Sequence, residues 1–593
     1  MLVASVWYPV RDTPWLAAAS AGVAFGLFLV AVRGHRVARA TRTLFDRLLT
    51  VAGESARRAG GHVTLIRSWQ RPETPAGTDL DPIVEDGPVW TLTEQERRDL
   101  DLFAPPVGMF GLLNRTSTAV GARRLRDMID HPCLSSDCIE VRRAAVQSLE
   151  QRPERRLRIM AAIAGLREHD DTTDRLIRAV RRATPLRTPW PLAFMRTWSL
   201  LSALLTVTAV VQAGRGRSGW GTVCIIVLML NTMYYLRMRA GLTAALAPWR
   251  NLGPVATAWL DASRRTVDEL STDDLRVQSL LSRLRACMTP TLAKDAWPRL
   301  RRSIGWADVG GVFHVGFNIV FFYDVHVAAA ILGCVVPRRA TMLTGLAAMG
   351  EVDALSSLAC FAWEQPTRCY PGTSSQPGIC LTAARHPLIP PDTSVPNDVA
   401  LDQQTRLWII TGSNMAGKST LLRTLGINTL LAQWGTAAVA QDMTWMPVRL
   451  VTDLQAADNL ADKESYFLAE VRHVRRMVDP PPADARLLGL IDEPFRGTNT
   501  AERVAASVAV VEHLLQSQHF FVVATHEPGL TQLADGAPAR NFHFRETLDG
   551  SDMVFDYRLR QGPARARNAL LVLEQEGYPP AMLVRARQWL KQG

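Results

Sequence analysis

A nine-residue segment of this 593-residue chain has the spacing G-x-x-x-x-G-K-S, which is typical of a phosphate-binding loop. Its lysine, Lys418, is one of only four lysines in the chain, against sixty-three arginines. A narrow ammonium group can reach between the β- and γ-phosphates of a nucleotide, whereas a planar guanidinium is too wide. We therefore predict that a nucleoside triphosphate binds at Gly412, Ser413, Asn414, Met415, Ala416, Gly417, Lys418, Ser419 and Thr420.

The residues on either side of this loop support the prediction. Residues 407–411 form a short apolar run typical of a buried strand, and residues 421–431 continue with helical periodicity. The glycines let backbone N–H groups curl around phosphate oxygens, and the helix N-terminus adds the positive end of its dipole. A chance glycine-rich turn is the alternative, but it would not account for strand, loop and helix together.

Two adjacent acids follow the apolar run 487–491. At such a strand end in a P-loop enzyme, an acid holds Mg²⁺ together with the loop hydroxyl, so we assign Asp492 and Ser419 to the metal. We assign Glu493 as the general base that activates the attacking water. Either acid alone could merely cap the following turn. Both together, in the same domain as Lys418, favour catalysis.

A histidine closes a further apolar strand, residues 520–524. The imidazole of His526 could hydrogen-bond the γ-phosphate and respond to its loss. Histidines at strand ends are also commonly packing or capping residues. The predicted catalytic residues are thus Lys418, Glu493 and His526, and the predicted cofactors are ATP and Mg²⁺.

The chain is long enough for several domains that would position these residues. Over residues 378–593, short apolar strands alternate with helices, which predicts an α/β domain with a mostly parallel sheet. Residues 91–365 show helical apolar spacing, which predicts an all-α region. Residues 366–377 and 41–90, both marked by proline and glycine, are expected to be linkers.

Three uncharged apolar runs, residues 13–32, 197–213 and 218–236, are each near the length that crosses a bilayer core of about 30 Å. We predict an N-terminal anchor within residues 1–40 and a transmembrane hairpin inside the helical region. Buried core helices are an alternative for all three runs, and a signal peptide is an alternative for the first. Four arginines at 33–42 favour an uncleaved anchor with its C-terminal side in the cytoplasm.

One crossing followed by a hairpin leaves the rest of the chain on one side of the membrane. We therefore predict location at the cytoplasmic membrane, with the ATPase domain facing the cytoplasm. A fourth apolar run, residues 312–336, contains Asn318 and Asp324. Charges at bilayer depth are costly, so we interpret this run as a buried soluble helix pair.

The formal net charge of +11 permits nucleic acid or an anionic membrane as a partner and chooses neither. Eight scattered cysteines without a C-x-x-C pair indicate free thiols in a reducing compartment. Arginines in the helical region could track the phosphates of double-stranded DNA, although such runs are more often solvated helix faces. These are Arg123, Arg124, Arg126, Arg142, Arg143, Arg152, Arg155, Arg156 and Arg158.

Several motifs together resemble those of the MutS mismatch-repair ATPases. They are the Asn-Met pair in the loop, the Arg-Gly-Thr in 492–502, and Ala-Thr-His-Glu at 524–527. Residues 458–470 resemble the helix that reaches the partner's nucleotide. The resemblance implies an ABC/MutS-type ATPase in a homodimer, with Ser465 contacting the γ-phosphate in trans. It also implies a helical core and lever domain before the ATPase, and DNA binding.

The chain departs from that family pattern in two places. Residues before 90 leave no room for the domain that reads mismatches, and an anchor is expected there instead. The predicted hairpin falls about where the family inserts its DNA clamp. We also expect the chain to end without the family's longer dimerisation tail.

Two functions follow from these observations. One is a membrane-anchored ATPase coupled to binding of DNA mismatches or structures and to repair. The other is an ATP-driven switch at the membrane that acts on protein partners, as yet unknown, without binding DNA. An ABC exporter is disfavoured, because three crossings are too few for a translocation path and no Leu-Ser-Gly-Gly-Gln motif is present.

Overall fold

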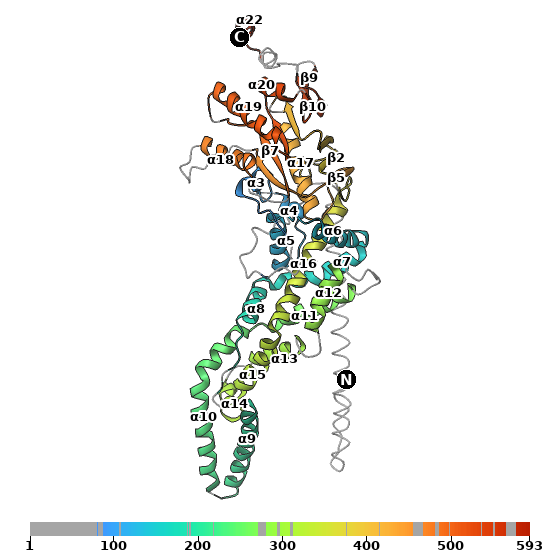
Figure 1. Ribbon diagram of the computed structural model, residues 1–593. Helices are drawn as coiled ribbons and strands as arrows, with labels where there is room; N and C mark the ends of the chain where they lie inside the picture. The colour runs from blue at the N-terminus through green and yellow to red at the C-terminus, as the bar shows by residue number, and fades with distance from the viewer. Residues whose placement is uncertain are drawn as a thin grey trace.

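The computed structural model describes most of the chain after its N-terminal part (Figure 1). The described residues are 80, 87–105, 108–186, 188, 191–217, 219–270, 280–292, 297–308, 312–374, 376–413, 416–454, 466–480, 485–496, 498–534, 536–549, 552–564 and 577–592. The predicted anchor at 13–32, the loop residues Asn414 and Met415, and Ser465 lie outside these ranges. So does most of the predicted linker at 41–90.

The N-terminal part of the described chain is helical, as predicted. Its shorter helices precede a long pair, α9 and α10, and its longest buried helix, α16, closes it. The elements are α3 (Glu94–Asp99), α4 (Met109–Leu113), α5 (Ala119–Asp130), α6 (Ser136–Gln151), α7 (Pro153–Ala164), α8 (Asp170–Arg182), α9 (Leu192–Gly214), α10 (Gly219–Leu246), η3 (Ala247–Trp249), α11 (Gly253–Glu269), α12 (Leu280–Leu292), α13 (Trp297–Ala307), α14 (Val312–Phe321), α15 (Tyr323–Val335) and α16 (Arg339–Glu364).

The C-terminal part contains two sheets. A six-stranded sheet has the order β10-β9-β4-β8-β7-β6, and a smaller four-stranded sheet has the order β1-β5-β2-β3. The strands are β1 (Gly372–Thr373), β2 (Gly378–Ala384), β3 (Asn397–Asp402), β4 (Leu407–Thr411), β5 (Asp442–Trp445), β6 (Val448–Asp453), β7 (Arg486–Asp492), β8 (Phe520–Ala524), β9 (Ala539–Asp549) and β10 (Asp552–Gln561). The helices are α17 (Lys418–Gln433), α18 (Tyr466–Val478), α19 (Thr500–Gln516), α20 (Pro528–Thr531) and α22 (Pro580–Gln592).

The larger sheet is mostly parallel, as the alternation of strands and helices predicted. Strand β4 pairs in parallel with β8 and β9, and β7 pairs in parallel with β6 and β8. Only the β9–β10 pair is antiparallel. The carboxyl ends of β4, β7 and β8 therefore meet at one edge, which is where ligands bind in such sheets. The smaller sheet begins inside the stretch expected to be a linker, because β1 pairs with β5.

Helix α16 lies in the middle of the elongated molecule, between the sheet domain and α15 (Figure 1). It is buried along most of its length and carries two buried acids. The carboxylate of Asp353 accepts hydrogen bonds from the backbone N–H groups of Ser117 and Thr118, at 2.9 to 3.1 Å. A Cβ on Gly121 would lie 2.4 Å from an Asp353 oxygen, so only glycine fits there. These contacts fix the start of α5 against the middle of α16.

The helical part is also joined directly to the large sheet. Asp99 at the end of α3 accepts hydrogen bonds from the Thr452 hydroxyl at 2.7 Å and the Leu454 N–H at 2.9 Å. The indole of Trp90 donates to the carbonyl of Leu450 at 2.8 Å. One apolar core runs continuously from Leu92 through α16 into the sheet. A movement of the sheet would therefore displace the helices packed on it.

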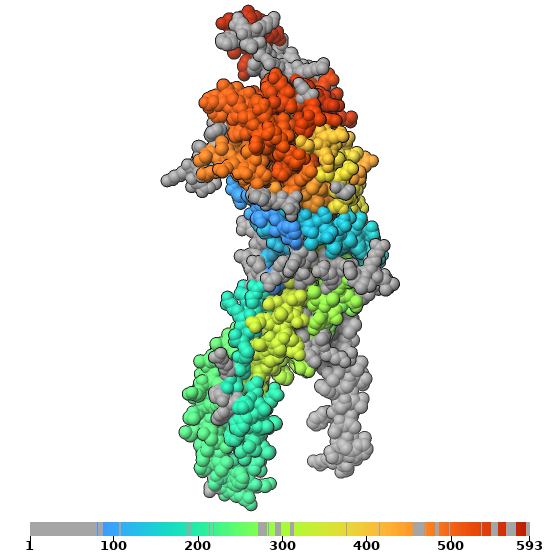
Figure 2. Space-filling view, in the orientation of Figure 1, coloured from blue at the N-terminus to red at the C-terminus, as the bar shows by residue number. Residues whose placement is uncertain are grey.

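The two apolar runs predicted as a hairpin lie in α9 and α10, which project from the rest of the molecule (Figure 2). Their outer surface is unusually apolar: Leu200 is 73% exposed and Met229 is 69% exposed. Within the hairpin, the Trp198 indole donates to the side-chain oxygen of Asn231 at 2.9 Å, which pairs two polar groups inside an apolar unit. The structure extends α10 ten residues beyond the predicted run, to Leu246.

By length and composition alone, three stretches of the described chain could cross a membrane: 192–212, 219–249 and 323–364. The first two are α9 and α10. The third combines α15 with α16, and it is the most buried of the three. Its apolar character is accounted for by the core that surrounds α16.

The interpretation of residues 312–336 as a buried helix pair is wrong for its first half. Two helices form, with a break at Phe322, whose φ of 48° ends α14. Helix α15 is largely buried, but α14 exposes apolar side chains, with Val315 53% exposed. Helix α14 packs beside the hairpin, where the hydroxyl of Ser199 donates to the carbonyl of Phe321 at 2.9 Å. The apolar surface of the hairpin therefore continues onto α14.

The arginines expected to track DNA phosphates mostly serve the interior of the helical part. Arg142 and Arg156 are 2% and 1% exposed. Arg124 donates to Glu351 at 2.5 Å, and Arg123 pairs with Asp174 at 2.8 Å. Arg143 and Arg155 donate to the backbone carbonyls of Pro371 and Glu269, and Arg126 lies over the ring of Phe103. Several of the nine arginines thus have partners within the fold, whereas Arg152 and Arg158 are exposed, and their contact with DNA phosphates stays a prediction.

Candidate nucleotide site

The phosphate-binding loop connects β4 to α17, as the sequence predicted. Gly417 has φ of 106°, a left-handed conformation that glycine tolerates, and α17 begins at the next residue. Lys418 is buried, and its Nζ donates to the carbonyl of Gly412 at 2.5 Å. Burial lowers the pKa of Lys418, while the nearby carboxylate of Glu493 opposes that shift. The ammonium is thus held inside the loop where phosphates would lie.

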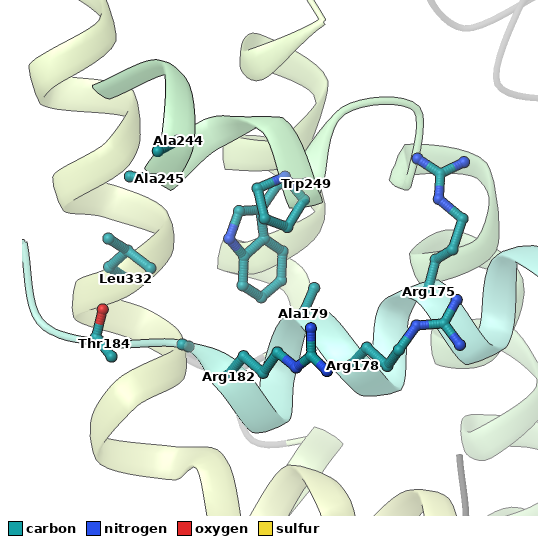
Figure 3. Close-up of a pocket in the computed structure, with 11 residues that line it drawn as sticks. Arg175, Arg178, Ala179, Arg182, Thr184, Ala244, Ala245, Trp249 and Leu332 are labelled. Atoms are coloured by element: carbon teal, nitrogen blue, oxygen red, sulfur yellow. The ribbon is translucent and has the colours of Figure 1, made fainter. Parts of the chain in front are cut away.

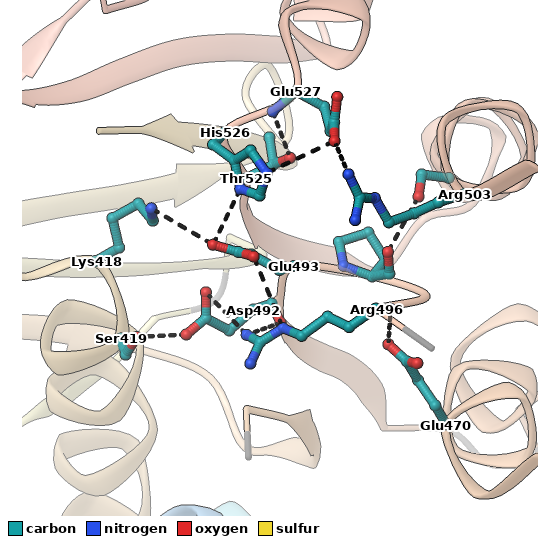
Figure 4. Close-up of polar contacts among 12 residues, drawn as sticks. Lys418, Ser419, Glu470, Asp492, Glu493, Arg496, Arg503, Thr525, His526 and Glu527 are labelled. Atoms are coloured by element: carbon teal, nitrogen blue, oxygen red, sulfur yellow. Dashed lines mark hydrogen bonds and ion pairs between the residues drawn. The ribbon is translucent and has the colours of Figure 1, made fainter. Parts of the chain in front are cut away.

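Four predicted residues meet at the carboxyl ends of β4 and β7 (Figure 4). The hydroxyl of Ser419 donates to the carboxylate of Asp492. The Nζ of Lys418 lies 3.8 Å from the carboxylate of Glu493. Glu493 has φ of 59°, which is uncommon for a residue with a side chain, so the turn after β7 directs two successive acids toward the loop.

His526 reaches the same cluster from the end of β8. Its Nδ1 lies 3.2 Å from the Glu493 carboxylate, and its Nε2 lies 3.6 Å from Glu527. Glu527 in turn accepts a hydrogen bond from Arg503 on α19. The imidazole is half exposed and stands beside the proposed general base. Lys418, Glu493 and His526 are therefore brought together.

Arg496, four residues after Asp492, is a site residue that the sequence assignments omitted. Its guanidinium lies 3.5 Å from the Asp492 carboxylate and 3.9 Å from that of Glu493. Its backbone N–H donates to the buried carboxylate of Glu470 at 3.1 Å. The sequence did contain a signal for this residue, because Arg496 opens the Arg-Gly-Thr run that follows the two acids. The residue's position shows that it orients both acids and links them to α18.

Negative charge exceeds positive charge around the end of β7. Burial raises the pKa of Asp492, and the hydrogen bond from Ser419 opposes the rise. Burial also raises the pKa of Asp453 to about 8, helped by the charges of Glu470 and Asp99. Such shifts arise where carboxylates lack enough cations to stabilise their charged form. A divalent cation at this edge would relieve that deficit.

The arrangement fits Mg²⁺ and a nucleotide phosphate. Ser419 and Asp492 offer the oxygen ligands that Mg²⁺ prefers, with phosphates and waters completing the shell. Among the described residues, no group of three or more His, Cys, Asp or Glu could hold a metal alone. The buried hydroxyl of Ser413 also has no hydrogen-bond partner in the described part of the chain. These residues would hold a nucleotide with its metal rather than a free metal ion.

A cavity of about 380 Å³ adjoins the loop and was not foreseen from the sequence. Gly417, Thr420 and Thr424 line one side of it, and Phe544 and Tyr557 line another. Asn397 ties β3 to β10 by donating to the carbonyl of Tyr557 at 2.9 Å and accepting from the N–H of Leu559 at 2.7 Å. The aromatic lining suits a flat base, so this cavity is the candidate base-binding site.

His386 supplies a polar group to that cavity. Burial lowers its pKa to about 4, and the positive charge of Arg423 acts in the same direction. The imidazole is therefore neutral at physiological pH and can act as a hydrogen-bond donor or acceptor without adding charge. Gly417 and Thr420 belong to the phosphate-binding motif, but His386, Asn397, Phe544 and Tyr557 come from parts of the chain far apart in sequence, and no local motif marks them.

A carboxylate from β9 occupies part of the loop's anion-binding surface. Glu546 accepts a hydrogen bond from the backbone N–H of Ser413 at 3.0 Å. It also lies near enough to Lys418 to act against the lowering of that residue's pKa. Backbone N–H groups of such loops bind phosphate oxygens. Glu546 therefore competes with a nucleotide for the same donor.

The fold and site define a P-loop nucleotide-binding domain of α/β type, joined to a helical region. Family models agree with this division: MutS domain V matches residues 408–592, and MutS domain III matches residues 95–215. The DNA mismatch repair protein MutS of Natronomonas pharaonis is 28% identical over 557 residues. That alignment covers 83% of this chain and 61% of the relative, so the chain spans less than two thirds of that protein's length.

The chain belongs to the MutS family. MutS domain V is a P-loop ATPase domain, which agrees with the predicted fold of residues 378–593. The family resemblance inferred from the loop, the Walker acids and the Ala-Thr-His-Glu segment is thereby confirmed. The match to domain III ends at residue 215, just after α9, in the turn between the two helices of the hairpin.

Glu546→Gln should tighten ATP binding about fivefold, because it removes roughly 1 kcal/mol of repulsion between a carboxylate and the phosphates. Titration of a fluorescent ATP analogue into the full-length protein measures the change. Glu512→Gln, which removes an exposed acid from α19 in the same domain, is the matched control and should bind like the unaltered protein. Unchanged or weaker binding by Glu546→Gln would mean that Glu546 orders the loop instead of competing with nucleotide.

Proposed function

We propose that this chain is a membrane-anchored ATPase of the MutS type, whose nucleotide state acts through α16 on DNA bound by its helical part. The observation that carries the ATPase role is the convergence of Lys418, Ser419, Asp492 and Glu493 at one sheet edge. The loop residues and the two acids are about seventy residues apart in the sequence. The fold brings them together as the set of side chains that phosphoryl transfer to water requires.

Each residue has one role in this proposal. Lys418 and the loop N–H groups would bind and orient the phosphates, and Ser419 with Asp492 would hold Mg²⁺, whose charge stabilises that of the transferring phosphoryl group. Glu493 accepts a proton from the attacking water. His526, in contact with Glu493, holds that carboxylate in place and responds to the γ-phosphate. Arg496, which lies within 4 Å of both carboxylates, offsets their mutual repulsion.

The proposed active unit is a homodimer. The family resemblance assigns Ser465 a contact with the γ-phosphate bound by the partner, and the half-exposed His526 leaves the site open on one side. The arrangement would make hydrolysis depend on association of two chains. It would also let ATP binding at one sheet edge bring two α16 helices, and with them two hairpins, into a new relative position.

Membrane anchoring is supported by the exposed apolar surface of the hairpin. Side chains such as Leu200, Leu204, Ile225 and Met229 are all more than half exposed, which costs free energy in water and none in a bilayer. Inside the hairpin the Trp198 N–H is satisfied by the side-chain oxygen of Asn231, as the membrane interior favours. The ATPase domain would then face the cytoplasm, at the far end of the molecule from the hairpin (Figure 1).

A switch that acts on protein partners without DNA is the second candidate. Its specific support is that most of the nine arginines once expected to bind phosphates are buried or already paired. DNA as a ligand is proposed from the relative named as a mismatch repair protein. The two candidates share the ATPase and the anchor, and differ only in what the helical part binds.

Glu493→Gln should bind ATP nearly normally and hydrolyse it about 10²–10⁴-fold more slowly, because the carboxylate acts on water and not on the metal. Asp492→Asn should instead weaken Mg²⁺-dependent binding of ATP. Steady-state hydrolysis and nucleotide titrations with and without Mg²⁺ separate the two effects. An identical phenotype for both variants would refute the division of roles between the acids.

The full-length protein should resist extraction from membranes by alkaline carbonate, and so should a variant that lacks either residues 1–40 or the hairpin alone. Loss of both, with the hairpin replaced by a short Gly-Ser loop, should release a soluble protein that keeps its ATPase. Each apolar unit is long enough to insert unaided. If the full-length protein washed off, α9 and α10 would be a soluble arm and the anchor would be ruled out.

Duplex DNA should bind the detergent-solubilised protein, with an affinity that falls linearly against the logarithm of salt concentration. Fluorescence anisotropy with a labelled duplex, in the presence of an ATP analogue, gives the slope and hence the number of phosphate contacts. Absence of binding at the lowest salt tested would reject DNA as the ligand and leave the protein-directed switch.

A further inference from the structure

A pocket of about 290 Å³ lies where the hairpin joins the helical part, away from the nucleotide site. Helix α8 forms one wall with three arginines, Arg175, Arg178 and Arg182. The opposite wall is apolar and includes Trp249 from η3 and Leu332 from α15 (Figure 3). The pocket therefore combines concentrated positive charge with a hydrophobic face.

The three arginines lie on one face of α8, because they are spaced by three and four residues. Arg175 donates to the backbone carbonyl of Arg250 at 3.3 Å, which adds no negative charge. No ion pair of Arg175, Arg178 or Arg182 occurs within the described part of the chain. Asp174, on the same helix, is paired with Arg123 at 2.8 Å. The cluster thus lacks an anion of its own.

Some other arginines of the helical region are neutralised within the fold: Arg123, Arg124 and Arg97 each meet a carboxylate within 3.0 Å. Three like charges on successive turns of one helix repel each other unless an anion lies between them. Three arginines without ion pairs that line one pocket therefore point to an anion supplied from outside the chain.

The pocket's position suggests where that anion comes from. The exposed apolar surface of α10 ends at Leu236, and Ala244 of the pocket follows eight residues later on the same helix. At 1.5 Å per residue this is about 12 Å along the axis. The polar headgroup layer of a bilayer extends about 5–8 Å beyond its hydrocarbon core, and arginine side chains extend toward that layer. The pocket therefore borders the headgroups of the cytoplasmic leaflet.

We propose that this pocket binds the headgroup of an anionic phospholipid. The guanidinium groups of Arg178 and Arg182 donate to the phosphate oxygens, a geometry that planar guanidinium favours. The apolar side with Trp249 and Leu332 accommodates the glycerol and the first acyl carbons. This inference rests on the proposed insertion of the hairpin, since only an inserted hairpin brings lipid to the pocket.

Lipid bound there would tie α8 to the end of α10. Arg175 already joins these two elements through the carbonyl of Arg250. A phosphate between α8 and η3 would add contacts at the point where the helical region meets the membrane. The orientation of the ATPase relative to the bilayer would then depend on the content of anionic lipid.

The test uses the full-length protein in a neutral detergent, titrated with dioleoyl phosphatidylglycerol or dioleoyl phosphatidylcholine and observed by native mass spectrometry. Phosphatidylglycerol should bind at least about tenfold more tightly. The triple variant R175Q/R178Q/R182Q should lose on the order of 100-fold in that affinity, from about fivefold per arginine near an anionic headgroup. R475Q/R540Q/R585Q removes three exposed arginines distant from the hairpin and should bind like the unaltered protein.

Equal affinity for the two lipids, or an unchanged affinity in the triple variant, would overturn the proposal. Two further measurements identify other sources of the phosphate group. If inorganic phosphate displaces the lipid at comparable concentration, the pocket is a free-phosphate site. If duplex DNA binding is lost in the triple variant while lipid binding remains, the arginines belong to a DNA surface. Either result rejects the lipid site.

Failure of this proposal is distinguishable from failure of the proposed membrane anchor. The triple variant keeps the hairpin unchanged, so it should still resist carbonate extraction and retain its ATP hydrolysis and melting temperature. A protein that is extracted by carbonate but binds phosphatidylglycerol in detergent would contradict the anchor alone. A protein that stays in the membrane without lipid selectivity contradicts the pocket alone.

Discussion

The buried acids of α16 are the constraint on which the rest of the structure depends. Asp353 and Glu351 lie in the apolar core, where an unpaired carboxylate would cost several kcal/mol. Asp353 accepts from the N–H groups of Ser117 and Thr118 and from the Thr118 hydroxyl, and one carboxylate oxygen of Glu351 accepts from Arg124. Because these bonds cannot be exchanged for water, α5 and α16 must move together. Helix α16 is bonded to the sheet domain, where the Thr436 hydroxyl donates to the carbonyl of Leu358, and it follows α15, which packs against α10 of the hairpin. Helices α15 and α16 together are the path along which a nucleotide-driven change would travel.

The site could be predicted from the sequence wherever its residues are local to one strand end. The loop, with Lys418 and Ser419, and the acids Asp492 and Glu493 follow apolar runs whose strands, β4 and β7, lie on either side of β8. Glu546 and the base cavity could not be predicted, because they depend on β9 and β10 folding back over the loop. That pairing is set by tertiary packing, and no residue in β9 carries a motif. The small sheet, with β1 in the expected linker, was missed for the same reason.

Periodicity identified the helices of the N-terminal region, but it could not assign their faces. Residues 312–336 have a helical pattern and two polar side chains, which was read as burial in protein. In the structure the polar side chains are satisfied locally. Asn318 and Asp324 each contact the His314 ring, and the Asn318 side-chain oxygen accepts from the backbone N–H of Asp324. Helix α14 can therefore expose its apolar side chains without exposing these polar groups. Likewise, the arginine-rich stretches looked like a surface for phosphates, although charge counts cannot distinguish a paired guanidinium from a free one.

Those two corrections together change where the chain would meet its surroundings. Apolar surface is added next to the hairpin by α14, and Arg123 and Arg124 of α5 are neutralised by internal ion pairs. Three arginines without ion pairs line the pocket at α8, beside the end of the hairpin. A helix bundle that enters an anionic bilayer from the cytoplasm has apolar side chains at bilayer depth and cations next to them on the cytoplasmic side. The nucleotide edge, by contrast, gathers carboxyl groups whose pKa values are raised mainly by burial. The two ends thus present different chemistry, and the helices between them join the two mechanically.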